Sequence, residues 1–204
     1  MLNQGLQQQG LRQRSLSDLL PESLLTDLAL IGVFAITIGI FAQISIPLPF
    51  TPVPITGQTF AVLIGSAALG LRRGTLGSLL YVGLGLMGVP WFAGATGGLK
   101  IAVDPTFGYL LGFIAAGAVV GYLAEKGLDR KFGRTVLLMA IGNVIIYSFG
   151  MGFLMLDLHL SIGRGLALGV TPFLLGDLIK LLLATGLLPG AWYLHNRLTR
   201  GREV

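Results

Sequence analysis

The stretch FLLGDLIK, residues 173–180, places an acid, Asp177, and a base, Lys180, three positions apart within an apolar segment. In a helix, a spacing of three puts both side chains on the same face. An ionised group inside a membrane is costly, and such groups usually face the interior of a helix bundle, where they mark a pathway or a ligand site. We therefore expect Asp177 and Lys180 either to bind a ligand or to neutralise each other as an internal ion pair.

The composition predicts an integral membrane protein. Of the 204 residues, 53% are hydrophobic and 11% are charged, whereas about 25% of the residues of a soluble domain are charged. The chain has no cysteine, and His159 and His195 lie far apart in it. We therefore expect no thiol chemistry, no metal site and no bound cofactor. The net charge of +5 is interpreted as a sign of membrane topology rather than of nucleic acid binding.

Apolar segments separated by polar or irregular ones predict six membrane-spanning helices. These segments are residues 28–46, 59–71, 76–92, 109–123, 136–156 and 171–195. Thr171 and Pro172 suit the N-cap and first turn of the last helix, which ends at residues 188–190 or continues to 195. The prediction is an all-α bundle, with a cytoplasmic polar arm at 1–25, a membrane domain at 26–195 and a basic cytoplasmic tail at 196–204.

The distribution of basic residues predicts the orientation of the bundle. Eleven of them would lie on one side of the membrane, namely Arg12, Arg14, Arg72, Arg73, Lys126, Arg130, Lys131, Arg134, Arg197, Arg200 and Arg202. The loops of the opposite side would hold Lys100 and Arg164. Because basic residues accumulate in cytoplasmic loops, we expect both termini to be cytoplasmic.

The segment IPLPFTPVPITGQ, residues 46–58, has four prolines and no charge. Alternating prolines exclude a helix and favour an extended backbone. Irregular backbone at membrane depth has to be buried in protein or to line a cavity. We expect this segment to cover a ligand pocket, with Thr56 and Gln58 as ligand contacts, and an ordinary surface loop is the alternative.

A second loop, AGATGGLKIAVDPTFG at residues 93–108, is rich in glycine but lacks the spacing of a phosphate-binding loop. Gly97 and Gly98 are therefore predicted to let the backbone approach a small ligand closely, unless the loop is merely flexible. Other candidate ligand contacts are polar or aromatic residues of the predicted spans: Gln43, Phe92, Tyr109, Asn143 and Tyr147. A lone buried asparagine is more often a hydrogen-bonding group between helices than a ligand contact.

Gly32, Ala35, Gly39 and Ala42 form a stripe of small residues along one face of the first predicted helix. Small side chains let helices approach each other closely in a membrane. The approaching helix belongs either to this chain or to a partner protein, and in the second case the stripe is a docking site.

Three stretches of the chain are similar to one known family. They are IPLPFTPVPITGQTFAVLIGSAALGLRRGTLGSLLYVGLGLMGVPWFAG (46–94), GYLLGF (108–113) and FLLGDLIK (173–180). Over roughly residues 28–195, the chain resembles the BioY family, the biotin-specific S components of energy-coupling factor (ECF) transporters. This resemblance implies a six-helix bundle in the prokaryotic cytoplasmic membrane that binds biotin with high affinity near its outer face and mediates its uptake.

The resemblance also implies partners and roles for single residues. It implies a transmembrane scaffold (T) subunit and a pair of ABC ATPases that hydrolyse ATP, and it implies that Asp177 and Lys180 contact biotin. The family docks on its scaffold through alanines spaced by four in the first helix, for which Ala35 and Gly39 are the nearest match. A homo-oligomer is a further partner state that the sequence permits.

Chemistry alone leaves several alternatives open. Asp177 could accept from the N–H groups of biotin's ureido ring, and Lys180 could donate to the ureido carbonyl or to the carboxylate. A stand-alone carrier of a small carboxylate or vitamin, coupled to protons or sodium, is the main alternative, although two matching broken helices are not evident. An intramembrane enzyme using Asp177 would need a second catalytic group, and the centres of the helices offer no histidine or cysteine. We therefore expect a transporter and not an enzyme.

Overall fold

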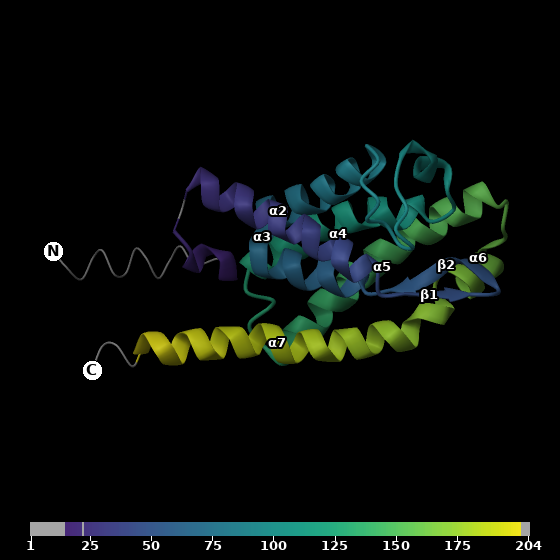
Figure 1. Ribbon diagram of the computed structural model, residues 1–204. Coiled ribbons are helices and arrows are strands. Elements are labelled where there is room, and N and C mark those ends of the chain that lie inside the picture. Colours follow the sequence, from purple (N-terminus) through teal and green to yellow (C-terminus); the bar gives the residue numbers. More distant parts are fainter. Residues whose placement is uncertain (1–14, 22, 201–204) are drawn as a thin grey trace.

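The computed structural model describes residues 15–21 and 23–200, which form helices and one short β-hairpin (Figure 1). The α-helices are α2 Leu24–Ala42, α3 Gln58–Leu86, α4 Phe107–Glu125, α5 Phe132–Asp157, α6 Ile162–Gly169 and α7 Leu174–Arg200. The short 3-10 helices are η1 Leu16–Leu19, η2 Leu99–Val103 and η3 Thr171–Phe173, and the strands are β1 Ser45–Leu48 and β2 Thr51–Thr56. Residues 1–14 of the predicted arm and residues 201–204 of the predicted tail lie outside the described residues.

Helix α3 folds back on itself at Gly70. This glycine has φ +81° and ψ −179°, a conformation that residues with a Cβ rarely adopt. Across the bend, a Cβ on Gly74 would lie 2.9 Å from the Cα of Ser66. Further along, Gln58 Nε2 donates a 2.7 Å hydrogen bond to the Tyr81 hydroxyl. The two arms are therefore antiparallel, and the reversal predicted between the second and third spans lies at this glycine.

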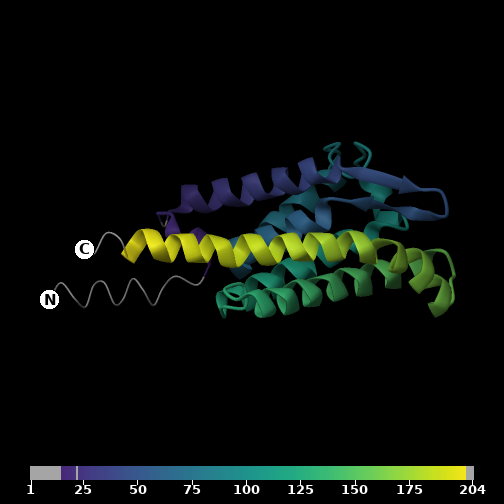
Figure 2. The ribbon, with the colours of Figure 1, turned by 90° about the horizontal axis from the view of Figure 1, so that it is seen from below.

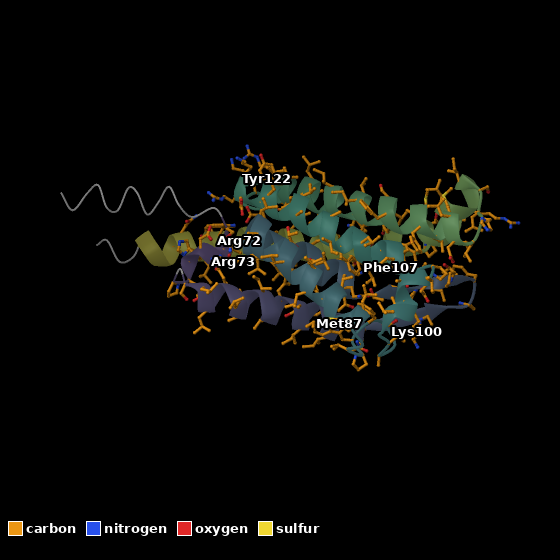
Figure 3. The ribbon with its side chains drawn as sticks, turned by 90° about the horizontal axis from the view of Figure 1, so that it is seen from above. Arg72, Arg73, Met87, Lys100, Phe107 and Tyr122 are labelled. Atoms are coloured by element: carbon orange, nitrogen blue, oxygen red, sulfur yellow. The ribbon has the colours of Figure 1, made fainter. Side chains whose placement is uncertain are left out.

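The long helices run roughly side by side, so the molecule has two ends (Figures 1 and 2). Helix α2 begins and α7 ends at the same end, whereas the hairpin and α6 lie at the other end (Figure 1). Figure 3 shows Arg72 and Arg73 toward the first end and Lys100 toward the second. Arg72 and Arg73 are thus at the end opposite to Lys100 of the glycine-rich loop.

Four helical segments among the described residues are long and apolar enough to cross a membrane: Leu24–Ala42, Phe107–Glu125, Phe132–Asp157 and Ile162–Arg197. On α7, Leu175 and Leu183 are 73% and 55% exposed, whereas Asp177 is 5% exposed. A helix on the surface of a water-soluble protein has the opposite arrangement, with polar residues outside. The sides of the bundle therefore suit contact with lipid.

The predicted all-α architecture is confirmed except for one hairpin. The proline-rich segment is extended, as predicted, but its residues form two antiparallel strands, with Ser45 opposite Thr56. Helix α6 occupies a stretch that the sequence analysis interpreted as a loop. The predicted N-cap role of Thr171 is wrong, because this residue lies within η3, whose N-cap is Val170. Helix α7 continues through Pro189 to its end at Arg200.

The small residues of α2 pack mostly inside the chain. Ala35 and Ala42 are 1% and 0% exposed, and a Cβ on Gly39 would lie 3.2 Å from the ring of Trp91. Gly32 has nothing within 4 Å of the position of a Cβ. Side chains of this chain therefore cover Ala35, Gly39 and Ala42, whereas Gly32 faces open space. Docking of a partner through the stripe stays a prediction.

Substitution of the two glycines should separate these environments. Gly39→Leu forces the Trp91 ring to move, and overpacking of this kind costs about 1–3 kcal/mol of unfolding free energy. Gly32→Leu is the matched control, since the added side chain meets open space. Thermal unfolding in detergent should show a lower Tm for Gly39→Leu alone. Equal Tm values for both variants would contradict the packing of Gly39 against Trp91.

Asp129, in the loop between α4 and α5, is completely buried. Its Oδ2 accepts a hydrogen bond from the Trp192 indole on α7, and its Oδ1 has no hydrogen-bond partner among the described residues. The Arg130 guanidinium lies 4.5 Å from the centre of the Trp192 ring. Burial raises the pKa of the Asp129 carboxyl, which the Trp192 hydrogen bond only partly offsets. The hydrogen bond between Asp129 and Trp192 therefore links the α4–α5 loop to α7, and it requires an ionisable carboxyl group to be buried.

The raised pKa predicts a pH dependence of stability. The folded chain keeps the Asp129 proton to a higher pH than the unfolded chain, so this group's contribution is complete below its ordinary pKa and is lost as pH rises through the raised value. Asp129→Asn keeps an acceptor for Trp192 without the charge. We expect its Tm to exceed that of the unchanged protein at pH 8, and this gain to shrink as the pH falls and the Asp129 carboxyl of the unchanged protein becomes protonated. Exposed Asp157→Asn is the control, and a pH-independent difference for Asp129→Asn would contradict the prediction.

Candidate functional site

A cavity of about 250 Å³ lies at the end of the bundle that carries the hairpin. Strand β2, the first arm of α3, the loop before α4, and helices α4, α5 and α7 form its wall. The polar lining side chains are Thr56, Gln58, Thr59, Thr96, Asp104, Thr106, Tyr109, Tyr147, Asp177 and Lys180. The apolar ones are Pro52, Val53, Pro54, Phe92, Ala93, Ile101, Leu110, Phe113, Ile146 and Phe173.

Asp177 and Lys180 form an ion pair in the wall of this cavity. Lys180 Nζ lies 2.6 Å from Asp177 Oδ1, and it also donates to the Thr56 carbonyl and the Thr59 hydroxyl, both at 2.8 Å. Because an ammonium has three protons, these acceptors occupy all of them. Asp177 Oδ1 accepts in addition from the Thr59 hydroxyl at 3.1 Å, and Oδ2 accepts from the Tyr147 hydroxyl.

The arrangement explains how a charged pair is tolerated in an apolar helix. Each charged atom has an opposite charge or a hydroxyl beside it, which offsets the cost of removing it from water. The partners come from three places in the chain: the junction of β2 and α3, which supplies Thr56 and Thr59, and helices α5 and α7. A ligand oxygen that accepts from Lys180 has to replace one of its three acceptors, and the Thr59 hydroxyl is the most adaptable of them because it both donates and accepts.

The hairpin covers the cavity, as the prolines predict. Thr51 Oγ1 donates a 2.9 Å hydrogen bond to the Leu168 carbonyl of α6, and the Thr56 carbonyl accepts from Lys180. Val53, between these two anchors, is buried and lines the cavity. Helices α6 and α7 thus hold the two ends of β2 in place over the site.

Aromatic side chains form another part of the wall. Tyr109 packs against Phe173 with ring centres 6.4 Å apart, and its hydroxyl donates to the Gly169 carbonyl at 2.7 Å. Phe92 meets the Tyr81 ring edge-on at 5.3 Å. These contacts fix the rings at the cavity surface. The rings therefore present apolar faces to a ligand, and the Tyr109 hydroxyl is hydrogen-bonded within this chain.

The structure brings seven of the eleven predicted ligand contacts to the cavity: Thr56, Gln58, Phe92, Tyr109, Tyr147, Asp177 and Lys180. Gln58 is nevertheless committed to the Tyr81 hydroxyl. Side chains that the sequence analysis missed also line the cavity, among them Thr59, Asp104 and Phe173. One feature of the sequence could have indicated Thr59 as a ligand contact, because it directly follows the predicted contact Gln58 in the first turn of α3.

The other four predicted contacts, Gln43, Gly97, Gly98 and Asn143, do not line this cavity. Gln43 Nε2 donates to the Trp91 carbonyl and its Oε1 accepts from the Ala95 N–H, so it holds the glycine-rich loop. A Cβ on Gly97 would lie 2.5 Å from the Val89 carbonyl oxygen, and Gly98 has φ +93°. The backbone geometry of this chain thus accounts for both glycines, and their contact with a ligand stays a prediction.

Asn143 lies on the other side of the ion pair. It lines a very small second cavity together with Thr59, Asp177 and Lys180, and its Oδ1 is buried without a hydrogen-bond partner among the described residues. The ion pair therefore separates the main cavity from Asn143, which explains why this residue does not reach the main cavity.

Comparisons with known proteins bear on this site. The sequence profile of the BioY family matches residues 12–197. A protein of Thermotoga maritima named "Biotin transporter BioY" is 42% identical over 153 residues, which are 75% of this chain and 88% of that protein. A protein of Rhizobium etli with the same name is 35% identical over 168 residues, covering 78% of this chain and 88% of that protein.

A solved structure shares the fold. It is titled "Crystal structure at 2.1 A of the S-component for biotin from an ECF-type ABC transporter", and it superposes with a TM-score of 0.75. The superposition covers 83% of this chain and 93% of that chain at 22% identity. The overall arrangement of the chain is therefore that of a known fold.

Proposed function

The chain belongs to the BioY family, and on this premise we propose that it takes up biotin as the substrate-binding S component of an ECF-type ABC transporter. Two relatives that match most of its length are named biotin transporters, and its fold is that of a biotin S component. Their names describe transport and not catalysis. The protein is thus a multi-pass membrane transporter component.

The observation that carries the proposal is the Asp177–Lys180 ion pair in the wall of a cavity that apolar side chains also line. Small-molecule sites typically combine apolar walls with a few precisely placed polar groups. Biotin fits this scheme, because its ureido ring has two N–H donors and one carbonyl, and its aliphatic chain is apolar. Asp177 would accept from the ureido N–H groups in exchange for Thr59 or Tyr147, and Lys180 would donate to a ligand oxygen.

Energy for uptake would come from other subunits. The sequence contains no phosphate-binding loop with the spacing of an ATPase. The proposal therefore includes a transmembrane scaffold subunit and a pair of ABC ATPases as partners. The chain itself would need no cofactor.

We extend the proposal to six membrane passes, made by α2, the two arms of α3, α4, α5 and α7. The Gly70 bend and the antiparallel arms support the count. Basic residues at the bend, where α2 also begins and α7 ends, support a cytoplasmic position for both termini in a prokaryotic cytoplasmic membrane. The cavity would then open toward the outer side, where biotin arrives.

The proposed function is tested by calorimetry on the purified full-length protein with biotin and with a panel of other vitamins. We expect saturable binding of biotin at one site per chain and none of the other compounds. Tight binding of a different vitamin, or no binding of biotin, would contradict the proposal. Uptake by reconstituted protein that stops with an uncoupler and ignores ATP would instead favour an ion-coupled carrier.

A further inference from the structure

A third charged side chain lines the cavity besides the ion pair. Asp104 lies between η2 and α4 and contributes to the wall together with Thr106. Its Oδ1 accepts from the Thr106 N–H at 2.9 Å and from the Thr106 hydroxyl at 2.6 Å. Neither of these donors carries a charge, so the carboxylate is hydrogen-bonded but not neutralised.

The charge of Asp104 is not balanced by a cation of the wall. The lining residues include two carboxylates and one ammonium, and the ammonium of Lys180 is committed to Asp177. Within residues 15–21 and 23–200, no ion pair includes Asp104. Lys100 and Arg164 of the same end are exposed and do not line the cavity. The wall therefore has a net charge of −1.

From this we infer that Asp104 determines the charge selectivity of the site, disfavouring an anionic group on the ligand relative to a neutral group of the same shape. The inference rests on the proposed function, because it concerns the carboxylate of biotin. Beside the low-dielectric wall of a protein cavity, like charges repel over several ångströms more strongly than in bulk solvent. The biotin carboxylate would thus be held away from the η2–α4 wall.

Two ligands and two variants test the inference. The ligands are biotin, an anion, and biotin amide, which has the same ring and chain without the charge. Asp104→Asn keeps the acceptor for Thr106 but removes the charge. Asp157→Asn is the matched control, since it removes the same charge from an exposed position at the same end of the bundle, outside the cavity.

Calorimetry should give the ratio of the biotin affinity to the biotin amide affinity for each protein. We expect Asp104→Asn to raise this ratio by about threefold to tenfold, as the loss of one repulsion between two carboxylates several ångströms apart would give. We expect Asp157→Asn to leave the ratio unchanged. An unchanged ratio in Asp104→Asn would overturn the inference while leaving the proposed function intact. An equal rise in both variants would also overturn it, because the effect would then be one of overall charge. An unchanged protein that binds neither compound would overturn the proposed function and this inference with it.

Discussion

Asp177→Asn and Lys180→Met should each weaken biotin binding by at least about tenfold to a hundredfold. Removing one partner of a buried ion pair typically lowers the free energy of unfolding by about 3–5 kcal/mol, because the other charge is left uncompensated. A lost charged hydrogen bond to the ligand separately weakens the binding free energy by about 1.5–3 kcal/mol. About 1.4 kcal/mol of binding free energy corresponds to a factor of ten in Kd. Calorimetry on the folded fraction in detergent measures this loss.

A second ion pair supplies the matched control. Arg73 pairs with Asp27 at 2.7 Å and with Asp18 at 3.2 Å, at the end of the bundle that is remote from the hairpin (Figure 3). Arg73→Met should therefore lower the Tm without changing the Kd for biotin. If it weakened biotin as much as Lys180→Met does, affinity would only report the integrity of the fold.

A double substitution separates a ligand site from a purely structural ion pair. Replacement of a buried ion pair by apolar side chains is often neutral or stabilising, so Asp177→Leu combined with Lys180→Leu should yield folded protein. We expect this protein to be unable to bind biotin. Normal biotin affinity in the double variant would show that the pair only stabilises the bundle.

Features that are costly in a membrane could be predicted from the sequence. Charged side chains and irregular backbone at membrane depth are tolerated where they are buried in protein or line a cavity. The structure places Asp177, Lys180 and two of the four prolines, Pro52 and Pro54, at the cavity. For the charged residues and for the prolines, the residue type alone excludes most positions in a lipid-facing helix. Hydropathy also predicted apolar segments that overlap the four long apolar helices of the described residues.

Residues whose partners are distant in sequence could not be assigned in this way. Gln43 is needed for hydrogen bonds to the backbone of Trp91 and Ala95, and Gly97 is needed because the Val89 backbone lies close to it. These partners belong to the same chain, and a sequence does not reveal them. Asp104 precedes a proline and a helix, a pattern that equally suits an ordinary helix start. Only the packing of η2 and α4 shows that its carboxylate also faces the cavity.

The close contact of helix α4 with the Gly70 bend predicts the second large effect, a loss of stability on substitution of Gly121. A Cβ on Gly121 of α4 would lie 2.6 Å from the carbonyl carbon and oxygen of Gly70 and 2.7 Å from the Leu71 nitrogen. These are backbone atoms, which cannot rotate away as a side chain can. One turn further along α4, Glu125 Oε1 accepts the Leu71 N–H at 2.8 Å. Any separation of α4 from the bend would therefore also stretch this hydrogen bond.

Gly121→Ala should thus destabilise the protein by about 3 kcal/mol or more, at the upper end of what overpacking costs. Gly83→Ala is the control on α3, because a Cβ there has nothing within 4 Å and alanine favours a helix by about 0.5–1 kcal/mol over glycine. Thermal unfolding in detergent should therefore show a large fall in Tm for Gly121→Ala and no fall for Gly83→Ala. Since the bend is remote from the cavity, the folded fraction of Gly121→Ala should still bind biotin with unchanged Kd. A Gly121→Ala protein as stable as Gly83→Ala would mean that α4 does not rest on the bend, and the antiparallel arms of α3 would then need another cause.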